Sequence, residues 1–168
     1  GSIISHPTGV RNGWNRGALT EVPAESYNNL ISRKRYDSRR GTAMEKQTAL
    51  KQYFGHTAFR PGQEVVIDAL LNGQDVLGVM PTGAGKSICY QIPALLLPGL
   101  TVVISPLISL MKDQVATLTQ VGIPAAYINS SLSDAQYQTV FRRATGGAYR
   151  ILYVAPERLA TADFRSLA

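Results

Sequence analysis

The chain has 168 residues, of which 45% are apolar and 17% charged, and its formal net charge is +6. This length suffices for one domain with a substantial core, and the composition excludes disordered and fibrous classes. The single cysteine, Cys89, excludes an internal disulfide and a zinc site built from cysteines. Three prolines and a glycine interrupt the apolar stretch 92–111, which favours a strand between two helices over a membrane span.

The positive charge is concentrated at the N-terminal end. Residues 1–43 hold seven Lys/Arg against three acidic residues and show no sustained hydrophobic period. We therefore interpret 1–43 as a basic, disordered extension and 44–168 as the folded domain. The basic cluster at 33–40 is either a contact for phosphates or a solvated tail. Because 44–168 carries only +2, charge alone does not predict a nucleic-acid partner.

Two helices are predicted before the glycine-rich centre of the chain. The apolar spacing within 45–54 predicts a helix that ends at Gly55. Pro61 suits the first turn of the next helix, which Asn72 and the glycine after it should end. The buried face of this second helix is expected to consist of Val65, Val66, Ala69 and Leu70.

The centre of the chain, 75–87, combines a short apolar strand, a glycine-containing turn and the start of a helix. Its last three residues have the ending of a phosphate-binding loop. Gly83 and Gly85 permit backbone angles closed to other residues and let main-chain N–H groups approach an anion. The helix adds the positive end of its dipole. Lys86 is placed to reach the β- and γ-phosphates, and Ser87 to join the shell of a Mg²⁺ ion.

Met80 stands where the strict phosphate-loop pattern has a glycine, so the pattern alone leaves two interpretations. One is a phosphate-binding loop, and the other is a glycine turn followed by a chance Lys-Ser pair. The buried-type strand before the turn and the helix predicted over 87–97 favour the phosphate loop. Cys89 lies in that helix and fits a small core residue better than a nucleophile.

The segment after this helix predicts a strand and a further helix. The β-branched run 101–105 lacks alternation, which is typical of a strand covered on both faces. Ser105 and Pro106 are expected to be the N-cap and the first residue of the helix, and Gly122 is expected to close it. The apolar stripe of this helix should comprise Leu107, Met111, Val115 and Leu118.

Strands are also predicted over 125–128 and 150–155, with a helix between them. Ser133 and Gln136 have the spacing of a capping box and mark the start of this helix. Pro156 should begin another turn or helix after the last strand. The inner face of the intervening helix is expected to comprise Tyr137, Val140, Phe141 and Ala144.

The alternation of strands and helices predicts an α/β fold in which crossover connections produce a parallel sheet with flanking helices. Ligands of such sheets bind at the carboxyl ends of the strands. The phosphate loop follows one strand, and polar or turn-forming segments follow the others. We therefore expect four segments to gather on one face: the phosphate loop, Ser105-Pro106, Asn129-Ser130 and 155–158.

The phosphate loop, over Met80–Ser87, resembles motif I of RecQ-type DNA helicases of superfamily 2, in which the Met-Pro-Thr-Gly opening is characteristic. Three further blocks are similar, in the right order, to motifs 0, Ia and Ib of that family: Phe54–Gln63, Ser105–Gln114 and Tyr153–Leu159. The similarity covers 45–168. It implies a partial RecA-like P-loop NTPase lobe, the N-terminal part of the first of two motor lobes.

The resemblance implies a site for ATP and Mg²⁺. Gln63 would hydrogen-bond the adenine edge, because its amide offers the donor and acceptor that N6 and N7 require. His56 could stack on the ring, and Arg60 would support the same pocket. Without the resemblance these three residues fit a first-turn polar residue, a loop end and a surface charge. Lys86 and Ser87 would be catalytic, with Ser87 on the metal, and the phosphates would contact Thr82, Gly83, Ala84, Gly85, Lys86 and Ser87.

The resemblance also implies a track for single-stranded DNA, 3′-to-5′ unwinding of duplex DNA in repair and recombination, and a cytoplasmic, nucleoid-associated location. Hydroxyl, amide and backbone N–H groups can hold a strand by its phosphates and sugars without distinguishing its sequence. Taken alone, Ser105 is an N-cap and Arg158 a solvated cation. The implied track residues are Ser105, Pro106, Asn129, Ser130, Pro156 and Arg158.

The family also has an Asp-Glu-x-His box whose acids hold Mg²⁺, yet no two acidic residues are adjacent in these 168 residues. We expect that box, and strands that flank the phosphate-loop strand, to follow Ala168, which would leave apolar sheet edges exposed. An arginine finger from the second lobe is worth ~10³ to 10⁵ in rate. We therefore expect this chain alone not to hydrolyse ATP at a helicase-like rate. The alternatives are a non-catalytic nucleotide- or single-strand-binding protein and a small-molecule kinase, against which the Gln63 block argues.

Overall fold

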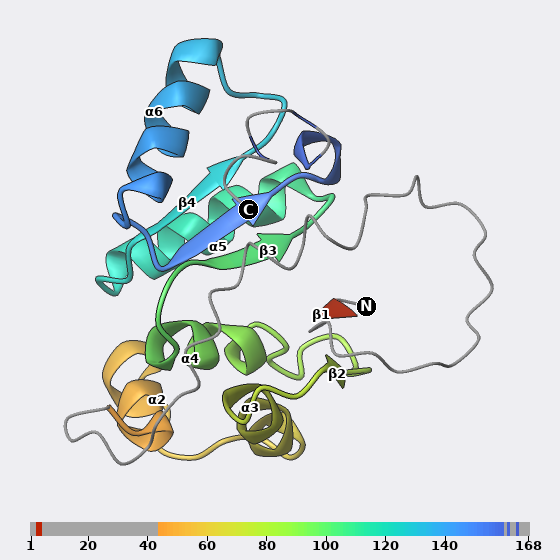
Figure 1. The fold of residues 1–168 in the computed structure, drawn as a ribbon. Coiled ribbons are helices and arrows are strands. Elements are labelled where there is room, and N and C mark those ends of the chain that lie inside the picture. The colour runs from red at the N-terminus through yellow and green to blue at the C-terminus, as the bar shows by residue number, and fades with distance from the viewer. Residues whose placement is uncertain (1–2, 5–43, 160, 162–163, 165–168) are drawn as a thin grey trace.

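The computed structural model describes residues 3–4, 44–159, 161 and 164, and Figure 1 shows their arrangement. The predicted extension 1–43 therefore lies outside the described residues except at Ile3–Ile4. The elements follow one another as β1 (Ile3–Ile4), α2 (Lys46–Phe54), α3 (Gln63–Leu71), β2 (Val76–Leu77), α4 (Ile88–Leu96), β3 (Thr101–Ile104), α5 (Ile108–Gln120), β4 (Ala125–Ile128), α6 (Asp134–Thr145), β5 (Ile151–Val154) and the 3₁₀ helix η1 (Pro156–Arg158).

A three-stranded parallel sheet forms the C-terminal half of the described fold, in the order β3-β5-β4. The central strand β5 pairs with both neighbours, with Ile151 opposite Thr101 on one side and Ala125 on the other. All four of its residues are buried, as its apolar run predicts for a strand covered on both faces. The predicted α/β class and parallel sheet are confirmed.

Alternate side chains of β5 enter two different parts of the core. Ile151 and Tyr153 pack with Met111 and Leu118 of α5. Leu152 and Val154 face the opposite way and pack with Tyr137 and Ala144 of α6. The two helices therefore cover opposite faces of the sheet, as Figure 1 shows, because neighbouring residues of a strand point to opposite sides.

A second layer consists of α2, α3 and α4, which pack around Leu50, Ile67 and Ile92. Lys46 of α2 forms ion pairs with Glu64 and Asp68 of α3. The predicted buried face of α3 is confirmed at Leu70 and wrong at Val65, while Val66 and Ala69 are half-buried. Val65 is 74% exposed, and the side chains that α3 buries are Gln63, Ile67 and Leu70.

The reason for this error is the orientation of α3. Its buried residues follow the spacing i, i+4, i+7 that begins at Gln63, the first residue of the helix. Gly62 is its N-cap, with φ of 83°, so Pro61 lies before the helix rather than in its first turn. A polar side chain thus occupies a core position, and the sequence pattern assigned that face to the neighbouring valines.

The strand that leads into the phosphate loop is also unlike the prediction. β2 contains only Val76–Leu77, and Leu77 and Val79 are 66% and 88% exposed. β2 pairs antiparallel with β1, whereas the other strands form the separate parallel sheet. The interpretation of this segment as a buried strand is therefore wrong for the described residues: Leu77 and Val79 lie at the surface, and Val76 is half-buried.

Local start and stop signals are mostly confirmed. Ser133 and Gln136 form the predicted capping box at the start of α6, and Gly122 follows α5 with φ of 81°. The N-cap of α5 is an exception, because that helix begins at Ile108 with Leu107 as its N-cap. The Ser105 hydroxyl instead accepts a hydrogen bond from the Leu107 N–H at 3.3 Å.

Within the described part of the chain, every helix is too short or too polar to cross a membrane. This agrees with the interpretation of 92–111 as a strand between two helices, since α4, β3 and the start of α5 occupy that stretch.

Candidate nucleotide and nucleic-acid site

The predicted phosphate loop joins β2 to α4, and two glycines determine its course. Gly83 and Gly85 have φ of 82° and 77°, in the left-handed region that favours glycine. Among the described residues, none accepts a hydrogen bond from the backbone N–H of Gly85, Lys86 or Ser87. These N–H groups precede the first turn of α4, where the positive end of the helix dipole lies. The arrangement suits an anion.

Lys86 lies over this loop. Its ammonium donates to the carbonyl oxygens of Met80 at 3.2 Å and Pro81 at 3.0 Å. Both acceptors are neutral carbonyls. Among the described residues, no carboxylate forms an ion pair with this ammonium. A phosphate is a stronger partner for the ammonium than a carbonyl, because the attraction between opposite charges adds to the hydrogen bond.

Gln63 and Arg60 hold the other side of the loop. The Gln63 amide nitrogen donates to the carbonyl oxygens of Ala84 and Gly85 at 3.3 and 3.0 Å. Its amide oxygen accepts from the Arg60 N–H at 2.8 Å. The Arg60 guanidinium donates to the Gly83 carbonyl. The resemblance implied that these residues lie at an adenine. The structure joins them to the phosphate loop, and Gln63 is only 3% exposed.

The other predicted nucleotide residues lie at the surface of the loop or beside it. His56 and Thr82 are exposed, whereas Ser87 is half-buried. Ser87 is the N-cap of α4, but its hydroxyl makes no cap hydrogen bond, which leaves it available to a ligand. The described residues contain no cluster of three His, Cys, Asp or Glu side chains that could hold a metal ion. The loop therefore presents backbone N–H groups, the Lys86 ammonium and the Ser87 hydroxyl, without a carboxylate cluster among the described residues.

The predicted single-strand track follows the carboxyl ends of β3, β4 and β5, which lie at one edge because these strands are parallel. Asn129 is fully buried, and its side-chain amide oxygen Oδ1 accepts from the Ser131 N–H and hydroxyl at 2.9 and 2.7 Å. Its amide nitrogen is buried without a hydrogen-bond partner, as is the Arg158 Nε. Arg158 lies 5.6 Å from the Tyr137 ring centre. At the surface of this edge are Pro106, Ser130 and Pro156.

A buried polar cluster connects the phosphate-loop helix to this sheet, and the sequence analysis missed it. Gln91 of α4 donates to Gln114 of α5 at 2.9 Å and to the Tyr153 hydroxyl at 3.4 Å. The Tyr90 and Tyr153 hydroxyls are 3.2 Å apart. Burial raises the pKa of Tyr153 and that of the Cys89 thiol, so both side chains are neutral at pH 7. The sequence signal that could have indicated this cluster is Gln91, a polar residue in a mostly apolar helix.

Comparison with known proteins agrees with this geometry. Residues 60–167 match the family described as DEAD/DEAH box helicase, which is more than half of the chain. The chain is 56% identical over 127 residues to the ATP-dependent DNA helicase RecQ of Haemophilus influenzae, an alignment that covers 74% of this chain and 20% of that protein. The chain belongs to the RecQ-type DEAD/DEAH box helicases.

Other RecQ-type relatives are similar over the same part of the chain. The RecQ helicase of Bacillus subtilis is 52% identical over 122 residues, which cover 70% of this chain and 20% of that protein. The Q-like helicase 4B of Arabidopsis thaliana is 43% identical over 115 residues, which cover 67% and 10%. This RecQ-type chain thus spans about one-fifth or less of the length of these relatives. The family shown here is the one that the four sequence blocks resemble.

Proposed function

We propose that this chain is the ATP- and single-strand-binding portion of a 3′-to-5′ DNA helicase that acts in DNA repair and recombination. The supporting observation is the loop itself: it carries three backbone N–H groups without an acceptor among the described residues, and the Lys86 ammonium belongs to the same loop. The relatives named above are ATP-dependent DNA helicases. Such a role would place the protein in the cytoplasm, at the nucleoid, with 44–168 as the domain and 1–43 as a basic extension.

In this proposal the loop residues from Thr82 to Ser87 bind the triphosphate, and Lys86 contacts its β- and γ-oxygens. Ser87 supplies one hydroxyl to Mg²⁺, which keeps most of its water ligands. When bound, the metal neutralises charge on the phosphates. His56 stacks on the adenine, while Gln63 contacts its edge and Arg60 supports the loop. The single strand follows Ser105, Pro106, Ser130, Pro156 and Arg158 along the carboxyl edge of the sheet, and the buried Asn129 holds the turn that carries Ser130.

Turnover of ATP tests the extent of this activity. We expect the chain to bind ATP with Mg²⁺ but to hydrolyse it at least about 10³-fold more slowly than the full-length H. influenzae relative, with single-stranded DNA present. One reason is that no carboxylate cluster accompanies Ser87 among the described residues. The other is that the proposed helicase takes its arginine finger from the second motor lobe, and such a finger alone contributes ~10³ to 10⁵ in rate.

The measurement is a steady-state phosphate-release assay, with the Lys86→Ala variant as background. Turnover close to that of the relative, abolished by Lys86→Ala, would contradict the expected slow hydrolysis. Absence of ATP binding would contradict the proposal itself. The alternative, a non-catalytic binding protein, would also bind ATP and single-stranded DNA without turnover.

Gln63→Ala separates a contact with adenine from support of the loop. Since its amide bonds two loop carbonyls, we expect the variant to bind both ATP and tripolyphosphate more weakly. Loss of the adenine contact should lower the affinity for ATP alone by a further factor of about five, which corresponds to one hydrogen bond of about 1 kcal/mol.

Isothermal titration with ATP and tripolyphosphate measures the two decreases, and Gln74→Ala, at an exposed position outside the loop, is the control. Equal weakening of both ligands would show that Gln63 supports the loop without contacting adenine. Unchanged binding of both would contradict both roles.

A further inference from the structure

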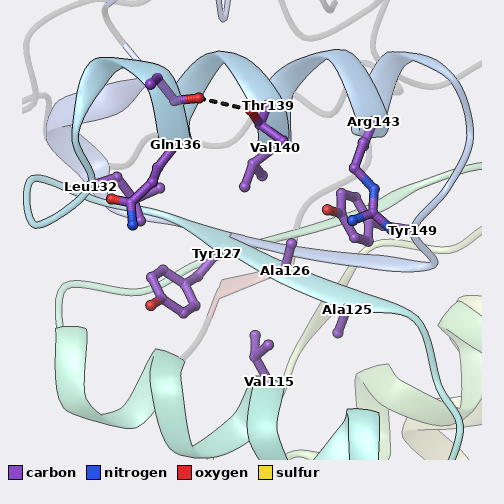
Figure 2. Close-up of a pocket in the computed structure, with 11 residues that line it drawn as sticks. Val115, Ala125, Ala126, Tyr127, Leu132, Gln136, Thr139, Val140, Arg143 and Tyr149 are labelled. Atoms are coloured by element: carbon purple, nitrogen blue, oxygen red, sulfur yellow. Dashed lines mark hydrogen bonds between the residues drawn. The ribbon is translucent and has the colours of Figure 1, made fainter.

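A groove runs along the outer edge of β4, the strand at one side of the parallel sheet. Its cavity has a volume of about 490 Å³ and lies between α6 on one face of the strand and α5 on the other, as Figure 2 shows. Alanines at 125, 126 and 135 leave this space open. Larger apolar side chains at its walls are Val115, Tyr127, Leu132, Val140 and Tyr149.

The backbone of β4 presents hydrogen-bonding groups to this groove. The Ile128 carbonyl accepts from the Ala155 N–H at 2.9 Å and the Pro124 carbonyl from the Ile151 N–H at 3.4 Å, so the even-numbered residues face β5. Successive residues of a strand direct their N–H and C=O groups to opposite sides. The N–H and C=O groups of Ala125 and Tyr127 therefore face the outer edge. No described residue pairs with them.

One charged side chain lines the groove within the described part of the chain, and it is positive. Arg143 is exposed, and its guanidinium lies 5.3 Å from the centre of the Tyr149 ring. This contact orients the guanidinium at the end of the groove near Ala125, as Figure 2 shows. A carboxylate is the group that complements an arginine at such a position.

We propose that β4 accepts an additional strand from a partner protein: an extended segment with aliphatic side chains and a carboxylate beside Arg143. The segment would pair with the N–H and C=O groups of Ala125 and Tyr127, and its aliphatic side chains would fill the groove. Addition of a strand to a free sheet edge is a general mode of peptide recognition. This site is separate from the phosphate loop, so it does not depend on the proposed ATP binding.

An extended segment fits this edge better than a second folded copy of the chain. The edge lies between two helices, α5 and α6 (Figure 2), and the four residues of β4 correspond to about 13 Å of extended chain. A single strand can enter between the helices, whereas two copies would have to bring both pairs of helices together. The positive charge of Arg143 on each copy would also oppose such a contact.

The test uses the whole 168-residue chain and a fluorescein-labelled peptide, Ser-Val-Ile-Val-Glu, whose β-branched residues favour an extended chain. We expect saturable binding with a Kd below about 1 mM. In a hydrogen-exchange experiment the peptide should slow exchange of the Ala125 and Tyr127 amides. A peptide methylated at alternate backbone nitrogens should bind at least about tenfold more weakly, because it loses strand hydrogen bonds.

Charge reversal tests the role of Arg143. Arg143→Glu should weaken binding of the Glu-containing peptide by about fivefold or more. A peptide with Lys in place of Glu should bind this variant with the affinity that the Glu-containing peptide has for the unchanged chain. Arg142→Glu is the matched control, because this neighbouring exposed arginine does not line the groove. Equal binding of the methylated peptide, or unchanged amide exchange, would overturn strand addition. Concentration-dependent dimerisation that protects the same amides without peptide would assign the edge to a second copy and overturn the proposal.

Discussion

Lys86→Ala should lower the affinity for ATP by about 10- to 100-fold and leave the free energy of unfolding nearly unchanged. The first effect follows from losing a charge-assisted hydrogen bond to phosphate, worth about 1.5–3 kcal/mol. The second follows from the contacts of the ammonium, which donates only to the carbonyl oxygens of Met80 and Pro81. Both carbonyls belong to the loop, and Pro81 is exposed, so water can replace the lost donor.

Isothermal titration with ATP and denaturant unfolding of the same samples measure the two quantities. Lys51→Ala is the matched control: Lys51 is also a lysine of the folded part, but it lies exposed in the last turn of α2, far along the chain from the loop. We expect this control to bind ATP like the unchanged chain. Equal ATP affinity in Lys86→Ala would refute the phosphate site, and a large loss of stability would show a structural role instead.

Gly85→Ala should have a larger effect on stability than Gly83→Ala, although both glycines have nearly the same backbone conformation. With φ of 77° and 82°, each alanine incurs roughly 1–2 kcal/mol of left-handed strain. A Cβ on Gly83 meets nothing within 4 Å, whereas one on Gly85 lies 2.5 Å from the Gln63 amide nitrogen. Gln63 must then move, and its buried hydrogen bonds to the loop are lost at a further cost of about 1–3 kcal/mol.

Denaturant unfolding of both variants measures this difference, and a double-mutant cycle identifies its cause. In a Gln63→Ala background the contact is absent, so Gly85→Ala should then cost no more than Gly83→Ala. Gly85→Ala should also weaken tripolyphosphate binding more than Gly83→Ala, because displacement of Gln63 changes the positions of the Ala84 and Gly85 carbonyls. Equal costs for the two glycine variants in the original chain would show that the loop tolerates movement of Gln63.

Features set by neighbouring residues could be predicted from the sequence. The Ser133–Gln136 capping box and the glycine that follows α5 depend on backbone geometry within a few residues. The buried strand β5 was evident because a strand covered on both faces needs an uninterrupted apolar run. The two glycines of the loop adopt the left-handed backbone angles that the sequence predicted, and the binding of phosphate there stays a prediction.

Features set by residues far apart in the chain could not be predicted in this way. Gln63 is buried because the loop 21 residues later offers it two carbonyl acceptors, and the apolar pattern of α3 contains no sign of that loop. The cluster of Gln91, Gln114 and Tyr153 likewise joins three elements. The exposure of β2 has the same origin, because a short apolar segment is buried only when other strands flank it.

That exposure has a consequence for handling the protein. Leu77 and Val79 present apolar surface beside an incompletely paired strand, which favours self-association. At low ionic strength the net charge of +6 keeps molecules apart, but the Debye length falls to about 10 Å at 0.1 M salt and 3 Å at 1 M. Washing bound nucleic acid away with concentrated salt would thus remove the repulsion that keeps the chain dispersed.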